Sequence, residues 1–135
     1  MKKEPTIQKY MTTEPRSIDA GESVRRAKTI MSDLGVRHLP VMNKGEVAGI
    51  LSDRDIKLAA GIMGADTDKM LVIDICPENP YTVHPDASLK DVAKTMADKH
   101  YGSAIVMQNN KLVGIFTTVD ACRALAEIIE TRFHE

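Results

Sequence analysis

The heptapeptide GILSDRD at residues 49–55 returns as GIFTTVD at residues 114–120. In both copies a glycine and two apolar residues lead to Ser or Thr, and an Asp follows three positions later. Ser/Thr-x-x-Asp is a capping box with a short acid: the hydroxyl accepts from a free backbone N–H, and the acid reaches back to the cap. Each copy therefore predicts a strand that ends where a helix begins. The second copy raises the question of a larger repeat.

That repeat spans most of the chain. An offset of 65 residues places residues 15–59 on residues 80–124 without a gap, and ten of the 45 pairs are identical. Self-similarity of this extent indicates that one structural unit has been duplicated. We place repeat one at about residues 7–60, a linker without clear periodicity at 61–71, and repeat two at about 72–129.

Both repeats predict the element order β-α-β-β-α. In the first, an extended piece at residues 16–18 precedes a helix that Ser23 caps and Gly35 ends. A hairpin turning at residues 43–45 follows, and the next helix begins at Ser52. In the second repeat the order recurs, with a hairpin turn at residues 109–110. The predicted fold is therefore a mixed α/β (α+β) pair of repeats.

The last helix, which begins at Thr117, carries an apolar stripe. The stripe consists of Leu125, Ile128, Ile129 and Phe133. Such a stripe packs on the helix's own sheet or on another chain, and we expect the first.

Composition narrows the function classes. The 135 residues suffice for one ordinary domain, and 18 Lys and Arg balance 19 Asp and Glu to a net charge of −1. No cationic surface of the kind that binds nucleic acid is predicted. No apolar stretch is long enough to cross a membrane, and we expect a cytoplasmic protein. Cys76 and Cys122 lack metal-ligand spacing, so we expect reduced, buried thiols.

The duplicated pattern, and above all HLPVMNKGEVAGILSDRDI at residues 38–56, resembles a tandem CBS (cystathionine β-synthase) domain pair. The resemblance covers about residues 7–129 and leaves no other domain, as in a stand-alone CBS-domain protein. It implies two pseudo-symmetric repeats packed through their sheets, two clefts that take adenosine-containing ligands, and a homodimer in solution that forms through helices of both copies. AMP, ADP and ATP are the first candidates as regulatory ligands, while S-adenosylmethionine, NAD and cyclic dinucleotides stay open. No cofactor and no enzymatic activity are expected.

The residue types in the pattern suit an adenine nucleotide. The Asp carboxylate of each copy accepts hydrogen bonds from both ribose hydroxyls, and the Ser or Thr with free helix amides suits a phosphate. The glycine leaves space beside the cleft, an Ile covers the purine, and backbone groups of the first strand meet the base edge. The candidate ligand-binding residues are Ser17, Ile18, Arg37, His38, Ile50, Ser52, Arg54, Asp55, Thr82, Val83, Gly102, Ser103, Ile115, Thr117 and Asp120.

The two clefts are expected to be unequal. In the family's packing, Asp120 shares a cleft with cationic residues of repeat one, whereas the surroundings of Asp55 are nearly neutral. Charge-assisted bonds to phosphate are the strong ones. We therefore expect phosphorylated adenosine at Asp120, and weak binding, an uncharged tail or no ligand at Asp55.

Two other functions remain open. A structural homodimerisation module with empty clefts needs no ligand, and an isolated Ser-x-x-Asp is in itself only a helix cap. A metal or redox sensor would use the cysteines and histidines. Cys76 aligns with Met11 and Cys122 with Lys57, so the repeat implies no symmetric site for such a sensor.

Overall fold

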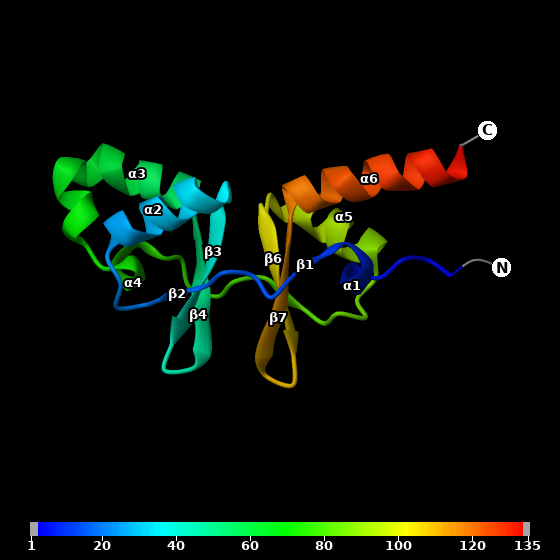
Figure 1. The fold of residues 1–135 in the computed structure, drawn as a ribbon, viewed down its shortest axis with the longest axis horizontal. Helices are drawn as coiled ribbons and strands as arrows, with labels where there is room; N and C mark the ends of the chain where they lie inside the picture. Colours follow the sequence, from blue (N-terminus) through cyan, green and yellow to red (C-terminus); the bar gives the residue numbers. More distant parts are fainter. Residues whose placement is uncertain (1–2, 134–135) are drawn as a thin grey trace. The chain divides into compact units, whose positions relative to one another are not determined.

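The computed structural model describes residues 3–133 and divides the chain into two compact units. One comprises Pro15–Pro80 and is called the N-repeat unit below. The other, the C-repeat unit, combines residues 3–14 with residues 81–133. Each unit has its own sheet and helices (Figure 1). The predicted mixed α/β class is confirmed.

The N-repeat unit holds a three-stranded sheet in the order β2-β3-β4. Strand β2 pairs with β3 in parallel, and β3 forms an antiparallel hairpin with β4. The elements in chain order are β2 (Ile18–Asp19), α2 (Val24–Leu34), β3 (His38–Asn43), β4 (Glu46–Ser52), α3 (Asp53–Met63), the 3-10 helix η1 (Gly64–Lys69) and α4 (Val72–Ile75).

The C-repeat unit repeats this plan with a four-stranded sheet in the order β1-β7-β6-β5. Strand β5 is parallel to β6, and β6 and β7 form the hairpin. The elements are α1 (Ile7–Tyr10), β1 (Thr12–Thr13), β5 (Thr82–Val83), α5 (Leu89–Lys99), β6 (Ser103–Gln108), β7 (Lys111–Thr117) and α6 (Thr118–Arg132).

The predicted helix boundaries follow from local chemistry. The Ser23 hydroxyl accepts from the amide of Arg26 at 3.0 Å, and Gly35 ends α2 in the left-handed region with φ 65°. His100 takes the same left-handed position after α5 with φ 59°. Within the predicted linker at residues 61–71, α3 continues to Met63 and η1 follows it. Thr67, only 2% exposed, anchors η1 by donating to the Gly64 carbonyl at 2.8 Å.

Each unit contains one short helix from the start of the other repeat: α1, at the start of repeat one, lies in the C-repeat unit, and α4, at the start of repeat two, lies in the N-repeat unit. Ile7 of α1 is fully buried in the core around Phe116, and Val72 of α4 is fully buried in the core around Leu39. The isolated bridge Thr6–Ser88 in one unit corresponds to Leu71–Ser23 in the other, at the same 65-residue offset. In Figure 1 the blue segment with α1 and β1 runs beside β7. We call residues 5–14 and 70–79 the straps.

The last helix differs from the expectation. Helix α6 packs on its own unit through Ala124, which is buried, and through the half-buried Ala121 and Ile128. Three large residues of the predicted stripe stay outside: Leu125, Ile129 and Phe133 are 60%, 49% and 78% exposed. Small alanines therefore face the core, and most of the stripe faces away from it.

Candidate functional site

The GILSDRD copy forms a complete capping box at the start of α3. The Ser52 hydroxyl accepts from the Asp55 amide at 3.1 Å, and Asp55 Oδ2 accepts from the Ser52 amide at 2.9 Å. The same Oδ2 accepts from the Ser52 hydroxyl at 2.8 Å. Within residues 3–133, every hydrogen bond to this carboxylate reaches Oδ2. The second oxygen of the half-buried Asp55 side chain is left to a ligand or water.

The GIFTTVD copy forms the same box at the start of α6. Asp120 Oδ2 accepts from the Thr117 amide at 3.0 Å and from the Thr117 hydroxyl at 3.2 Å. The hydroxyl of Thr12 also lies against this carboxylate, 3.3 Å from Oδ1 and 3.5 Å from Oδ2. Arg123 Nη1 lies 3.9 Å from Oδ1. Asp120 is only 6% exposed.

Thr12 is the residue that the sequence did not reveal. It lies in the strap, far in sequence from Asp120, and β1 pairs with β7 so that Thr12 is opposite Ile115. The 65-residue offset contains the signal, because it sets Thr12 against Pro77, which has no hydroxyl. Extending the offset to the straps identifies the difference, but only the strand pairing brings Thr12 to the carboxylate.

The residues before each hairpin differ in charge between the units. In the N-repeat unit the Asp53 amide donates to the Arg37 carbonyl at 2.9 Å, and His38 pairs with Ser52 across the hairpin. At the equivalent positions of the C-repeat unit stand Gly102, whose carbonyl accepts from Thr118 at 3.1 Å, and the buried Ser103.

Burial changes the acidity of two groups beside Asp55. Desolvation lowers the pKa of His38, and the Arg37 charge adds to this, while the carboxylates of Asp55 and Asp53 oppose it. Desolvation raises the pKa of the Cys76 thiol from 9.0 to about 11, and the negative charge of Asp55 contributes. Both groups are therefore favoured in their neutral forms, and Asp55 has a neutral neighbourhood on these two sides.

The predicted purine-covering residues lie on the sheet face turned away from their helices. Pro40 is opposite Ile50, and Ile105 is opposite Ile115. Side chains alternate along a strand, and Leu39, Val41 and Leu51 belong to the core on the other face. Ile50 is half-buried and Ile115 is 6% exposed.

The first strand of each repeat, β2 or β5, can offer a ligand its backbone groups but not its side chains. Ile18 is 3% exposed within the core, and Val83 packs against the other core. Strands β2 and β5 lie at the edges of their sheets, so their outer backbone groups are not used by the sheets. Ser17 is half-buried and Thr82 exposed, immediately beside these edges.

The structure thus distributes the candidate residues over two half-sites, one in each unit. The N-repeat half-site contains Ser17, Ile18, Arg37, His38, Ile50, Ser52, Arg54 and Asp55. The C-repeat half-site contains Thr82, Val83, Gly102, Ser103, Ile115, Thr117 and Asp120. The exposed Arg54 follows Asp53 in the first turn of α3. Which residues of one repeat meet the carboxylate of the other stays a prediction.

The role expected for the two glycines needs correction. Gly49 and Gly114 were expected to leave space beside a ligand, but the straps fill that space. A Cβ on Gly49 would meet the Pro77 carbonyl oxygen at 2.5 Å, and a Cβ on Gly114 would meet the sulfur of Met11 at 2.6 Å. Only glycine lets the straps pass this closely.

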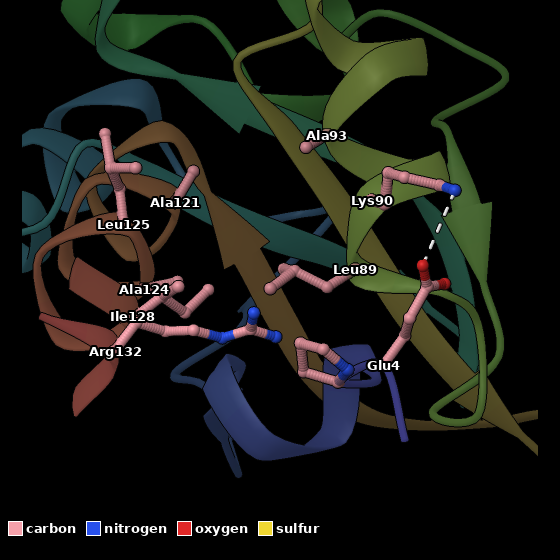
Figure 2. A pocket seen from close by; sticks show the side chains of 10 residues that line it. Glu4, Leu89, Lys90, Ala93, Ala121, Ala124, Leu125, Ile128 and Arg132 are labelled. Carbon is pink, nitrogen blue, oxygen red and sulfur yellow. Dashed lines mark ion pairs between the residues drawn. The ribbon is translucent and has the colours of Figure 1, made fainter. Parts of the chain in front are cut away.

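An apolar groove of about 350 Å³ lies between α5 and α6 in the C-repeat unit. Figure 2 shows Leu89, Ala121, Ala124 and Ile128 along it, with Arg132 at its rim. The Lys90 ammonium and the Glu4 carboxylate form an ion pair of 3.6 Å at its edge, drawn as a dashed line in Figure 2.

Residues 3–133 have the following features that bear on metal ligands, thiols and membrane spans. No group of three or more His, Cys, Asp or Glu side chains is arranged to hold a metal ion in that range. Cys76 is buried, as expected, whereas Cys122 is exposed. None of the helices described is both long and apolar enough to span a membrane.

Comparison with known proteins agrees with this architecture. A sequence model of the CBS domain matches residues 7–61 and 72–127. The CBS domain-containing protein YhcV of Bacillus subtilis (strain 168) is 27% identical over 115 residues, which cover 85% of this chain and 81% of YhcV.

Two solved structures share the fold. The CBS domain pair of protein MJ0100, in complex with 5′-methylthioadenosine and S-adenosyl-L-methionine, superposes with a TM-score of 0.83 at 23% identity. That match covers 93% of this chain and 99% of the other. CBSX2 in complex with AMP superposes with a TM-score of 0.77 at 24% identity, over 91% of this chain and 97% of the other.

Proposed function

The chain belongs to the CBS domain family, and from that premise we propose that it is a regulatory module that binds an adenosine-containing ligand. The observation that carries the proposal is the duplicated capping box, which presents one carboxylate in each half-site. The bound forms of MJ0100 and CBSX2 support adenosine as the common element of the ligand. We propose AMP, ADP or ATP as the first ligands to test, and no catalytic step.

The carboxylates suit ribose. The unused Oδ1 of Asp55 accepts two hydrogen bonds, which matches the two hydroxyls of a ribose. Bonds from a neutral hydroxyl to an ionised acceptor are about twice as strong as those between neutral groups.

Fewer groups at each helix start are free to bind a phosphate than the sequence suggested. In the first turn of α3, Asp53 and Asp55 use their amides for the Arg37 carbonyl and the Ser52 hydroxyl. Within the described residues the Arg54 amide has no such partner. The Ser52 hydroxyl already donates to Asp55, so it must turn before it donates to a phosphate. We propose that one amide and one reoriented hydroxyl meet the phosphate in each half-site.

The test is a thermal shift panel of AMP, ADP, ATP, S-adenosylmethionine, NAD and cyclic dinucleotides, followed by calorimetry. A ligand that binds the folded chain raises Tm in step with RT ln(1 + [L]/Kd). Asp55→Ala and Asp120→Ala are expected to reduce this shift. Asp53→Asn is the matched control, because it removes a carboxylate from the same helix turn. No shift with any compound, in a chain that folds normally, would overturn the proposal.

A second proposed property is a homodimer formed through helix α6. Leu125, Ile129 and Phe133 follow one another at four-residue spacing, and all three are at least 49% exposed. The apolar groove beside α6 extends this surface. Contiguous exposed apolar surface marks an interaction site, and a two-fold pairing places the same surface on both partners. This contact would form with or without a ligand.

Light scattering of the eluting protein tests the dimer. Leu125→Asp combined with Ile129→Asp places charges in the contact and is expected to give the monomer mass. Leu34→Asp is the control, because Leu34 is 52% exposed at the end of α2 and outside the α6 surface. A monomer mass for the unmodified chain at micromolar concentration would refute the dimer.

A further inference from the structure

We propose that Thr12 determines which of the two carboxylates accepts the ribose cis-diol: its hydroxyl closes Asp120, whereas Pro77, its repeat equivalent, leaves Asp55 open. The inference rests on the proposed function, because it assigns unequal ribose affinities to the two half-sites, and it reverses the sequence-based expectation that Asp120 is the stronger of the two. It adds a residue that belongs to the strap and to neither capping box.

The two carboxylates differ in how many of their acceptor positions are already used. An ionised carboxylate offers about four lone-pair positions. At Asp55 two are used, both on Oδ2. At Asp120 the same two are used, and the Thr12 hydroxyl approaches Oδ1 and Oδ2 together. The two hydroxyl donors of a ribose can therefore both bind to the free Oδ1 of Asp55. At Asp120, Thr12 already takes up part of the acceptor capacity of Oδ1.

The two carboxylates also differ in how accessible they are to a ligand. Arg123 Nη1 lies 3.9 Å from the same Oδ1 that Thr12 contacts, and Asp120 is 6% exposed. Asp55 is half-buried and lacks both neighbours within the described residues. At 3.3 Å the Thr12 contact is long for a hydroxyl donor, whose usual distance is about 2.7 Å. The hydroxyl therefore makes only a weak hydrogen bond, but it occupies the space beside Oδ1 that a ribose hydroxyl would need, and its removal is the informative change.

The strap that carries Thr12 is held in place by strand pairing and by burial. Thr12 and Thr13 pair with Ile115 and Gly114 in the sheet, and Ile7 is fully buried in the core. The Ile7 amide donates to the Ala87 carbonyl at 2.9 Å. The fold of the unit therefore holds the Thr12 side chain beside Asp120.

Chemical labelling tests, without any nucleotide, whether Thr12 limits access to the Asp120 carboxylate. Carbodiimide and an amine couple to accessible carboxylates, and peptide fragmentation separates Asp53, Asp55 and Asp120. We expect Asp55 to label several-fold faster than Asp120, and Thr12→Ala to raise Asp120 labelling several-fold. Thr12→Ser keeps the hydroxyl and should leave the rate unchanged, with Asp53 as internal reference. If Thr12→Ala leaves Asp120 as slow as in the unmodified chain, the proposal is wrong.

Calorimetry with AMP and 2′-deoxy-AMP tests the consequence for binding. In an Asp55→Ala background, Thr12→Ala is expected to raise AMP affinity about three- to tenfold and to leave 2′-deoxy-AMP less affected. In an Asp120→Ala background, Pro77→Thr places a threonine hydroxyl at the position beside Asp55 that is equivalent to Thr12. This change should lower AMP affinity by a similar factor. If Thr12→Ala does not change AMP affinity, or lowers it, the assignment is overturned.

The two experiments separate two failures. If the unmodified chain binds no adenine nucleotide, the proposed function fails, and the labelling rates still decide whether Thr12 shields Asp120. If AMP binds and Thr12→Ala has no effect on labelling or affinity, the proposed function stands and the role of Thr12 is refuted.

Discussion

Gly49 lies directly against Cys76: a Cβ on residue 49 would stand 2.7 Å from the Cys76 sulfur and 2.5 Å from the Pro77 carbonyl oxygen. At the equivalent glycine, Gly114, an added Cβ would stand 2.6 Å from the Met11 sulfur and 3.0 Å from the Thr12 carbonyl oxygen. Each strap thus crosses its sheet where the strand has no side chain. The capping boxes begin three residues further on, so the strap and the helix start are built on the same short stretch.

The first prediction concerns these two contacts. Gly49→Ala is expected to lower the free energy of unfolding by about 1–3 kcal/mol, the usual cost of overpacking. Gly114→Ala should cost less, because its nearest contact is the end of a flexible methionine side chain, whereas the nearest atom to Gly49 is backbone. Urea unfolding measures both.

Gly61→Ala is the matched control for this pair. Gly61 lies inside α3 with nothing within 4 Å of the added Cβ, so alanine should stabilise the chain by about 0.5–1 kcal/mol. If Gly49→Ala is as harmless as Gly61→Ala, the strap does not pass as closely as the structure has it.

The second prediction follows from the exchange of straps. Ile7 stands at the start of repeat one in the sequence but is buried in the core of the C-repeat unit. Ile7→Ala should cost about 2–5 kcal/mol through the cavity that it leaves. Hydrogen exchange should show the loss of protection in β6 and β7, with β3 and β4 much less affected. Val72→Ala is the reciprocal variant and should loosen β3 and β4. Loss of protection in β3 and β4 from Ile7→Ala would contradict the exchange.

The local parts of this fold could be predicted from the sequence. Caps at Ser23, Ser52 and Thr117 and the hairpin turns depend on residues within a few positions, and the structure has all of them. The 65-residue offset and the resemblance to CBS pairs supplied the rest of the plan. The prediction failed where two segments far apart in sequence determine the outcome.

The straps illustrate that failure. Nothing local in Thr12 indicates that β1 will pair with β7, because two residues are too short for a periodic pattern. The prediction that the apolar stripe on α6 packs on its own sheet failed for a related reason. Leu125 and Ile129 have the right spacing for burial, but Ala121 and Ala124 allow the helix to approach its unit more closely. Hydrophobic spacing identifies an apolar face and does not say what covers it.

The third prediction contrasts the two thiols. Burial raises the pKa of Cys76 to about 11, so almost none of it is thiolate at neutral pH. Cys122 is exposed on α6. Iodoacetamide at pH 7.4 should therefore alkylate Cys122 first and Cys76 much more slowly, as peptide mass spectrometry measures. In Cys122→Ser the fast phase should vanish. Rapid alkylation of Cys76 in the folded variant would contradict its buried position.

The fourth prediction concerns stability in mild acid. Burial lowers the pKa of His38 below its ordinary value of 6.5. As pH falls through that ordinary value, the unfolded chain binds a proton on this residue while the folded chain stays neutral. The unfolded state then holds more protons, so the free energy of unfolding falls as the pH drops from about 6.5 to the lowered pKa. His38→Gln should remove this part of the pH dependence. The control is His100→Asn, which keeps an exposed residue that tolerates the left-handed conformation after α5. Urea unfolding between pH 7.5 and about 5 compares the three proteins. If His38→Gln has the same pH profile as the unmodified chain, His38 is not held neutral by the fold.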